Sequence, residues 1–133
     1  MNIKYLFICL SASIFLTTAF LSQAQPEKNN HKKDMEQLLS KNIGLACTVE
    51  GPLTIKAIEK KEMENIRKSP QAPQVPFGFQ NQDWQQFKRK YSKGSEIYFF
   101  TSSPESWEGL YGRQGYALIR NNTVIEIIIT LMN

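Results

Sequence analysis

The hydrophobic residues of this chain form one long apolar run at the start and then recur at helical or strand spacing. Residues 5–21 are almost wholly apolar, follow Lys4 and precede the small residues Ser22 and Ala24. A short basic start, an apolar stretch and small residues just before a cleavage site are the three parts of a secretory signal peptide. We therefore predict a signal peptide over residues 1–24, cleaved after Ala24.

An uncleaved membrane anchor is the alternative interpretation of this run. Its 17 residues are at the short limit for a membrane-spanning helix, which needs about 20, and the cleavage site follows directly. No later segment of the sequence is long and apolar enough to span a membrane. We therefore expect a periplasmic or secreted protein with no transmembrane segment after cleavage.

The 109 residues that remain, 25–133, suffice for one domain with a packed core. Residues 25–34 contain no hydrophobic residue and include the only histidine, His31. Such a segment has nothing to bury, so we predict a disordered tail over residues 25–34 and a single domain over residues 35–133.

Two segments of this domain show the helical repeat of hydrophobic residues. Residues 56–68 carry isoleucine and methionine on one face and charged residues elsewhere, and a proline-rich loop follows them. In residues 82–92, three aromatic side chains fall on one face, namely Trp84, Phe87 and Tyr91. We predict a helix over each segment and a short helix over residues 35–41.

Period-two alternation predicts strands over residues 43–49, 96–101, 116–120 and 123–132. Asn121-Asn122 separates the last two, and asparagine tolerates the positive φ of a tight hairpin turn. The predicted fold class is α+β. Short N-terminal helices pack on one face of a three- to four-stranded antiparallel meander that ends in a C-terminal hairpin.

The hairpin turn fixes a register in which opposite residues share a face. The expected pairs are Arg120 with Thr123, Leu118 with Ile125, and Tyr116 with Ile127. A run of three isoleucines, residues 127–129, would promote aggregation if it lay on an open edge. We therefore expect the last strand to be central or covered.

Cysteine content and charge change this picture little. Cleavage removes Cys9 and leaves Cys47 alone between apolar neighbours, which indicates a buried small residue more than a reactive thiol. The mature chain has 15 basic and 12 acidic residues, a net charge of +3. This mild balance allows weak contact with an anionic surface and does not indicate nucleic-acid binding.

The sequence contains little that suggests catalysis. His31 lies in the predicted tail, so it offers no oriented imidazole for a nucleophile. One histidine and one mature cysteine fall short of a zinc ligand set. Three basic residues beside the aromatic ones, Lys88, Arg89 and Lys90, lie on a helix whose aromatic face points to the core. We predict no metal, no cofactor and no nucleic-acid partner.

Aromatic residues gather around a glycine-rich loop that contains an arginine. The candidate binding residues are Trp107, Tyr111, Arg113 and Tyr116, and these residue types are enriched in protein interfaces. An alternative is a small enzyme or small-molecule binder that uses Glu105 or Glu108 with Arg113, because paired carboxylates can act as acid and base.

No motif assigns the chain to a family. The leading hypothesis is an exported, non-enzymatic protein that binds another macromolecule, most simply a protein, in the cell envelope or outside the cell. An accessory factor, an inhibitor and an immunity-type protein all fit this description. Weak attachment to anionic lipid through the lysines is a third hypothesis.

Overall fold

The computed structural model describes residues 25–133, which form four α-helices and one antiparallel sheet of four strands. In chain order the elements are α1 Gln25–Ile43, β1 Cys47–Leu53, α2 Ile55–Ile66, the 3-10 turn η1 Gly78–Gln80, α3 Asn81–Lys90, β2 Ser95–Ser102, α4 Pro104–Glu108, β3 Arg113–Arg120 and β4 Thr123–Met132. The predicted signal peptide, residues 1–24, lies outside the described residues. Within the described part, no helix is long and apolar enough to cross a membrane.

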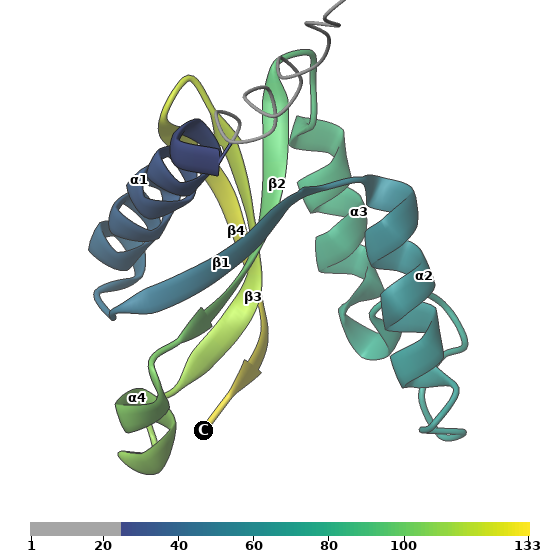
Figure 1. Ribbon diagram of the computed structural model, residues 1–133. Helices are drawn as coiled ribbons and strands as arrows, with labels where there is room; N and C mark the ends of the chain where they lie inside the picture. The colour runs from purple at the N-terminus through teal and green to yellow at the C-terminus, as the bar shows by residue number, and fades with distance from the viewer. Residues whose placement is uncertain (1–24) are drawn as a thin grey trace, which may run out of the picture.

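The strands follow one another in the order β1-β2-β3-β4, so the sheet is a meander that ends in the β3–β4 hairpin. The predicted α+β class is therefore confirmed. The sequence placed the helices on one face, whereas the structure places α1 on one face and α2 with α3 on the other (Figure 1). Both faces of the sheet must be covered because β2 and β3 carry large apolar side chains on both of their sides.

Each face has its own core. On the α1 side, Met35 and Leu39 pack on Val49, Phe100 and Ile119. On the other side, the buried side chains come from α2, the α2–α3 connection, α3 and the sheet: Ile58, Phe77, Trp84, Phe87, Ile97, Tyr116, Leu118 and Ile128. Alternation along β3 divides its residues between the two cores.

Helix α1 runs through the segment that the sequence assigned to a disordered tail. The prediction of disorder over residues 25–34 is therefore wrong. The segment lacks hydrophobic residues, but His31 reaches the sheet, where its Nε2 lies 2.9 Å from the hydroxyl of Tyr98. Glu27 in the first turn also favours the helix because its negative charge lies near the positive end of the helix dipole. The contact between His31 and Tyr98 thus outweighs the polar composition of residues 25–34.

The β3–β4 hairpin keeps only part of the predicted register. Arg120 pairs with Thr123, and Asn121 and Asn122 have positive φ, as expected for the tight turn. A register shift lies between Leu118 and Ile119, so the other two predicted pairs are wrong: Leu118 pairs with Glu126 and Tyr116 with Ile128. The extra residue lets Val124, Ile127 and Ile129 face the α1 core, while Ile125 and Ile128 face the other core.

At Gly115 the backbone of β4 leaves no room for a side chain on β3. A Cβ atom built there would lie 1.9 Å from the carbonyl oxygen of Ile128, a distance that backbone atoms cannot accommodate without moving. We predict that Gly115→Ala lowers the free energy of unfolding by about 3 kcal/mol or more. The matched control is Gly94→Ala. Its φ is +80° with no neighbour near the new Cβ, so its cost is about 1–2 kcal/mol. Urea unfolding measures both, and equal losses would contradict the close approach.

Candidate functional site

Helix α4 and the loop after it close one end of the sheet. Pro104 occupies the first position of α4, where a missing N–H costs nothing, and the backbone N–H of Ser103 donates to the carbonyl of Ala46. The indole N–H of Trp107 donates to Thr101 Oγ1 over 3.3 Å. Its ring lies against Gly112, where a Cβ would come within 2.3 Å of it. Trp107 is therefore half-buried and packs across this end of the sheet.

The structure brings three of the four predicted binding residues to this end. Trp107 is half-buried, and Tyr111 and Arg113 are exposed. Tyr116 is fully buried in the core, where its hydroxyl donates to Glu62 Oε1 over 2.6 Å. Burial, reinforced by this carboxylate, raises the pKa of Tyr116. Tyr116 cannot contact a partner, because the strand alternation turns it inward against Phe77 and Trp84.

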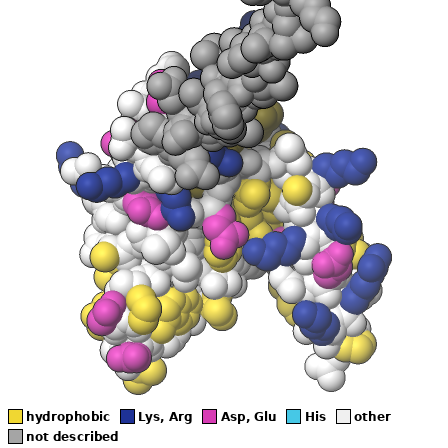
Figure 2. Space-filling view, viewed as in Figure 1, with side chains coloured by type: hydrophobic (Ala, Val, Ile, Leu, Met, Phe, Trp, Pro, Cys, Tyr) yellow, Lys and Arg dark blue, Asp and Glu magenta, His cyan; other side chains and the backbone are white. Residues whose placement is uncertain are grey.

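Sequence reasoning missed the hydrophobic residues that complete this surface. Leu110, Leu131 and Met132 have 73%, 52% and 69% of their surface exposed. Asn133 holds the chain end in place, since its backbone N–H donates to Gly112 and its side-chain amide to Trp107. We call the set the α4-end surface: Trp107, Leu110, Tyr111, Arg113, Leu131 and Met132. Figure 2 shows hydrophobic side chains gathered beside acidic ones at the α4 end.

The carboxylates of this region do not line an enclosed site. Glu105, Glu108 and Arg113 are all exposed, and within residues 25–133 no ion pair joins the arginine to either glutamate. Hydrogen bonds from its own backbone N–H and from Ser103 hold the pKa of Glu105 below its usual range, which suits a helix start. No group of three potential metal-ligating side chains occurs in the described part of the chain.

Two of the three basic residues of α3, Lys88 and Lys90, form ion pairs with acidic side chains. Lys88 Nζ lies 2.7 Å from Glu59 Oε1, which also accepts the indole N–H of Trp84 over 2.9 Å. Lys90 pairs with Glu126 on β4. The aromatic residues Trp84 and Phe87 are buried, as the helical spacing predicted, so they offer no stacking platform for a nucleic acid.

The hydrogen bond from Lys88 is the main cause of the lowered pKa of Glu59. A carboxylate with a lowered pKa stabilises the fold at pH values above its ordinary pKa, about 4.5, and this stabilisation is lost as the pH falls below it. We predict that Glu59→Gln is less stable than the wild type at pH 7 and that the difference shrinks between pH 5 and pH 3. Urea unfolding at these pH values measures it. A difference that stays constant would contradict the role of the charge.

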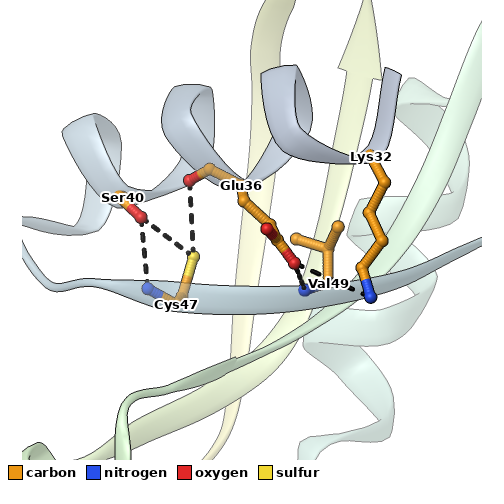
Figure 3. A network of polar contacts seen from close by, with 5 residues as sticks. All are labelled: Lys32, Glu36, Ser40, Cys47 and Val49. Atoms are coloured by element: carbon orange, nitrogen blue, oxygen red, sulfur yellow. Dashed lines mark hydrogen bonds and ion pairs between the residues drawn. The ribbon is translucent and has the colours of Figure 1, made fainter. Parts of the chain in front are cut away.

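Helix α1 closes the outer edge of β1 with side-chain acceptors (Figure 3). The backbone N–H of Cys47 donates to Ser40 Oγ over 3.1 Å, and that of Val49 donates to Glu36 Oε1 over 3.3 Å. Lys32 lies 3.8 Å from the same carboxylate oxygen. Two outward donors of an edge strand are thereby satisfied within the molecule.

The same network encloses the thiol of Cys47, which lies 3.4 Å from Ser40 Oγ and 3.8 Å from the carbonyl oxygen of Glu36. Cys47 is free and buried, in agreement with the sequence interpretation. Burial raises the pKa of the Cys47 thiol, so little of the nucleophilic thiolate is present at neutral pH.

We predict that folded Cys47 reacts with a disulfide reagent at pH 8 more slowly than the urea-unfolded chain by roughly two orders of magnitude, because reaction requires local opening. The rate of thiolate release, followed by absorbance, measures this. Ser40→Ala is the informative variant, since it removes one edge acceptor and is expected to accelerate labelling. Equal rates in the folded and unfolded chains would show that the thiol is accessible.

Strand β4 forms the other edge of the sheet. We expected this strand to be central or covered, and the structure shows that it is not central but is covered on its two faces. Its two faces pack against α1 and α3, and the side-chain amide of Gln80 donates to the carbonyl of Ile129 over 3.0 Å.

No family model matches the chain, and neither a curated protein nor a solved structure is significantly similar to it.

Proposed function

We propose that this protein binds another protein through the α4-end surface. The observation that supports the proposal is the clustering of exposed hydrophobic side chains, with Leu110, Tyr111, Leu131 and Met132 each more than half exposed. Single exposed hydrophobic residues are ordinary, whereas a group of them with an aromatic residue and an arginine is typical of interfaces.

The elements behind this surface suit it for recognition. Trp107 packs on Gly112 and bonds to Thr101, so the loop does not need to become ordered when it binds. A preorganised loop loses less conformational entropy on association, which favours affinity. Glu105, Glu108 and Arg113 supply a polar rim at which charge can select the partner.

The proposal places this binding outside the cytoplasm, because the sequence of residues 1–24 has the three parts of a signal peptide. It describes a non-enzymatic role, as an accessory factor, an inhibitor or an immunity-type protein in the envelope or outside the cell. The two groups that most often act as nucleophile or base are engaged elsewhere. His31 contacts Tyr98 and Glu96, and Cys47 is buried. The alternative site at Glu105, Glu108 and Arg113 has no enclosing geometry to support it.

The test is affinity capture from the extracytoplasmic fraction of the native host, with the wild-type chain and with the double variant Leu110→Ser and Tyr111→Ser. We expect the wild type to retain one protein in stoichiometric amount and the variant to bind it roughly tenfold more weakly, a loss of about 1.4 kcal/mol. Titration of the captured protein by calorimetry provides the affinity.

Tyr91→Ser is the matched control for this experiment. Tyr91 is also a partly exposed aromatic residue, but it follows α3 beside Lys90, whose carbonyl bonds to Arg120 at the hairpin end of β3. That end is opposite to α4, so this variant should retain the partner at full affinity. A partner that is lost equally with both variants, or with neither, would contradict the proposed surface.

A further inference from the structure

The two edges of the sheet differ in how their backbone groups are satisfied. On β1, α1 side chains accept the outward N–H groups of Cys47 and Val49, and Pro52 has no N–H to offer. The pairing of β1 with β2 also becomes irregular between Glu50 and Leu53. Capping, proline and irregular pairing are the usual means by which proteins prevent an additional strand from pairing with an edge.

Strand β4 shares the irregular pairing, since its register with β3 shifts at two places, but it lacks the proline, and its capping is limited to Gln80 within residues 25–133. The bond from Gln80 shows that the carbonyl of Ile129 points away from β3, and the two-residue repeat of a strand places the backbone groups of Ile127 on the same outer side. By the same alternation, the N–H groups of Ile127 and Ile129 point to this outer side, away from β3. Residues 123–132 contain no proline, lysine or arginine.

A groove of about 180 Å³ runs beside this edge, between α3 and β4. Its lining consists of polar side chains of η1 and α3, the ring of a core phenylalanine and the β4 edge: Gln80, Asp83, Gln86, Phe87, Glu126 and residues 127–129. The glutamine amides can both donate to and accept from a peptide backbone. The lining contains two carboxylates and no basic side chain, and within the described chain Asp83 forms no ion pair.

We propose that β4 binds an extended, basic segment of the partner protein by strand addition. The segment pairs its backbone with the outward groups of Ile127 and Ile129, and one of its lysine or arginine side chains lies against Asp83. This inference rests on the proposed function and names the chemistry of the partner. It is continuous with the α4-end surface, because β4 itself ends in Leu131 and Met132.

A second copy of this chain is a poorer occupant of the edge. A two-fold contact through β4 would bring Asp83 of both copies to the same interface, where like charges repel. A basic segment instead neutralises Asp83, whereas Glu126 is already paired with Lys90. The charge of the groove therefore selects a basic partner segment over self-association.

The experiment is selection of short random peptides, displayed on phage, against the protein purified after expression of the full chain. We expect the selected peptides to be rich in β-branched residues, to carry lysine or arginine and to lack proline at their centre. Their addition should shift the amide resonances of Ile127 and Ile129 and leave those of Cys47 and Val49 unchanged. Failure to select any peptide, or selection of acidic ones, would overturn the proposal.

Two variants test the site with the selected peptides. Asp83→Lys reverses a charge on the exposed side of α3 and should weaken binding roughly tenfold, whereas Asp34→Lys, the same change on α1, should leave the affinity unaltered. Gln80→Ala frees the carbonyl of Ile129 and should strengthen binding severalfold. Because Asp83 and Gln80 are exposed, these variants are expected to fold, and circular dichroism checks this. Equal affinities for all three would contradict strand addition.

The same variants separate this inference from the proposed function. If Asp83→Lys leaves capture of the natural partner unchanged while Leu110→Ser with Tyr111→Ser abolishes it, strand addition is wrong and the proposed function stands. If neither set affects capture, both proposals are wrong. Sedimentation equilibrium supplies a further outcome, since a dimer that Gln80→Ala strengthens would assign the edge to a second copy and overturn the choice of a basic partner.

Discussion

An open sheet of four strands has two faces whose apolar surface must be buried and two edges whose backbone groups need hydrogen-bond partners. Most features of this chain follow from these two requirements. Helix α1 covers one face and reaches over the outer edge of β1 with Glu36 and Ser40. Helices α2 and α3 cover the second face (Figure 1). Within residues 25–133, the side chain that hydrogen-bonds to the outer edge of β4 is Gln80. The two edges are therefore unequal, and the proposed strand addition rests on this asymmetry.

Polar contacts of α2 stabilise the second face in addition to its apolar packing. Glu62 accepts the hydroxyl of Tyr116, and Glu59 accepts the indole N–H of Trp84. Both aromatic residues are buried, and the polar atom of a buried aromatic side chain needs a partner because its desolvation is otherwise uncompensated. The two glutamates thus join α2 to the sheet and to α3, although Ile58 is the only residue of this helix that is fully buried.

Much of the fold could be predicted from the sequence because local periodicity carries it. The helices at α2 and α3 and the strands β2, β3 and β4 follow from hydrophobic spacing, and Asn121-Asn122 predicted the hairpin turn. The first half of α1 could not be predicted, since the contact between His31 and Tyr98 joins positions 67 residues apart. The register shift between Leu118 and Ile119 could not be predicted either, because Ile125 and Ile127 are equally apolar and either could face the same core.

The candidate surface was predicted only in part for the same reason. Trp107, Tyr111 and Arg113 stood out as residue types that interfaces favour, but burial of Tyr116 depends on which side of β3 faces α2. The sequence indicated that Leu131 and Met132 belong to a strand that packs on the core. Both are exposed because the two cores of the described residues include no β4 residue beyond Ile129. No sequence pattern shows where along a strand the core ends.

The measurement that tests this account most directly is native-state hydrogen exchange of individual backbone amides by NMR. The capped edge predicts slow exchange at Cys47 and Val49, whose N–H groups bond to Ser40 and Glu36. The open edge predicts fast exchange at Ile127 and Ile129, although the two strands belong to one sheet. Equal protection at the two edges would contradict the claim that the chain closes one edge and leaves the other open to a partner.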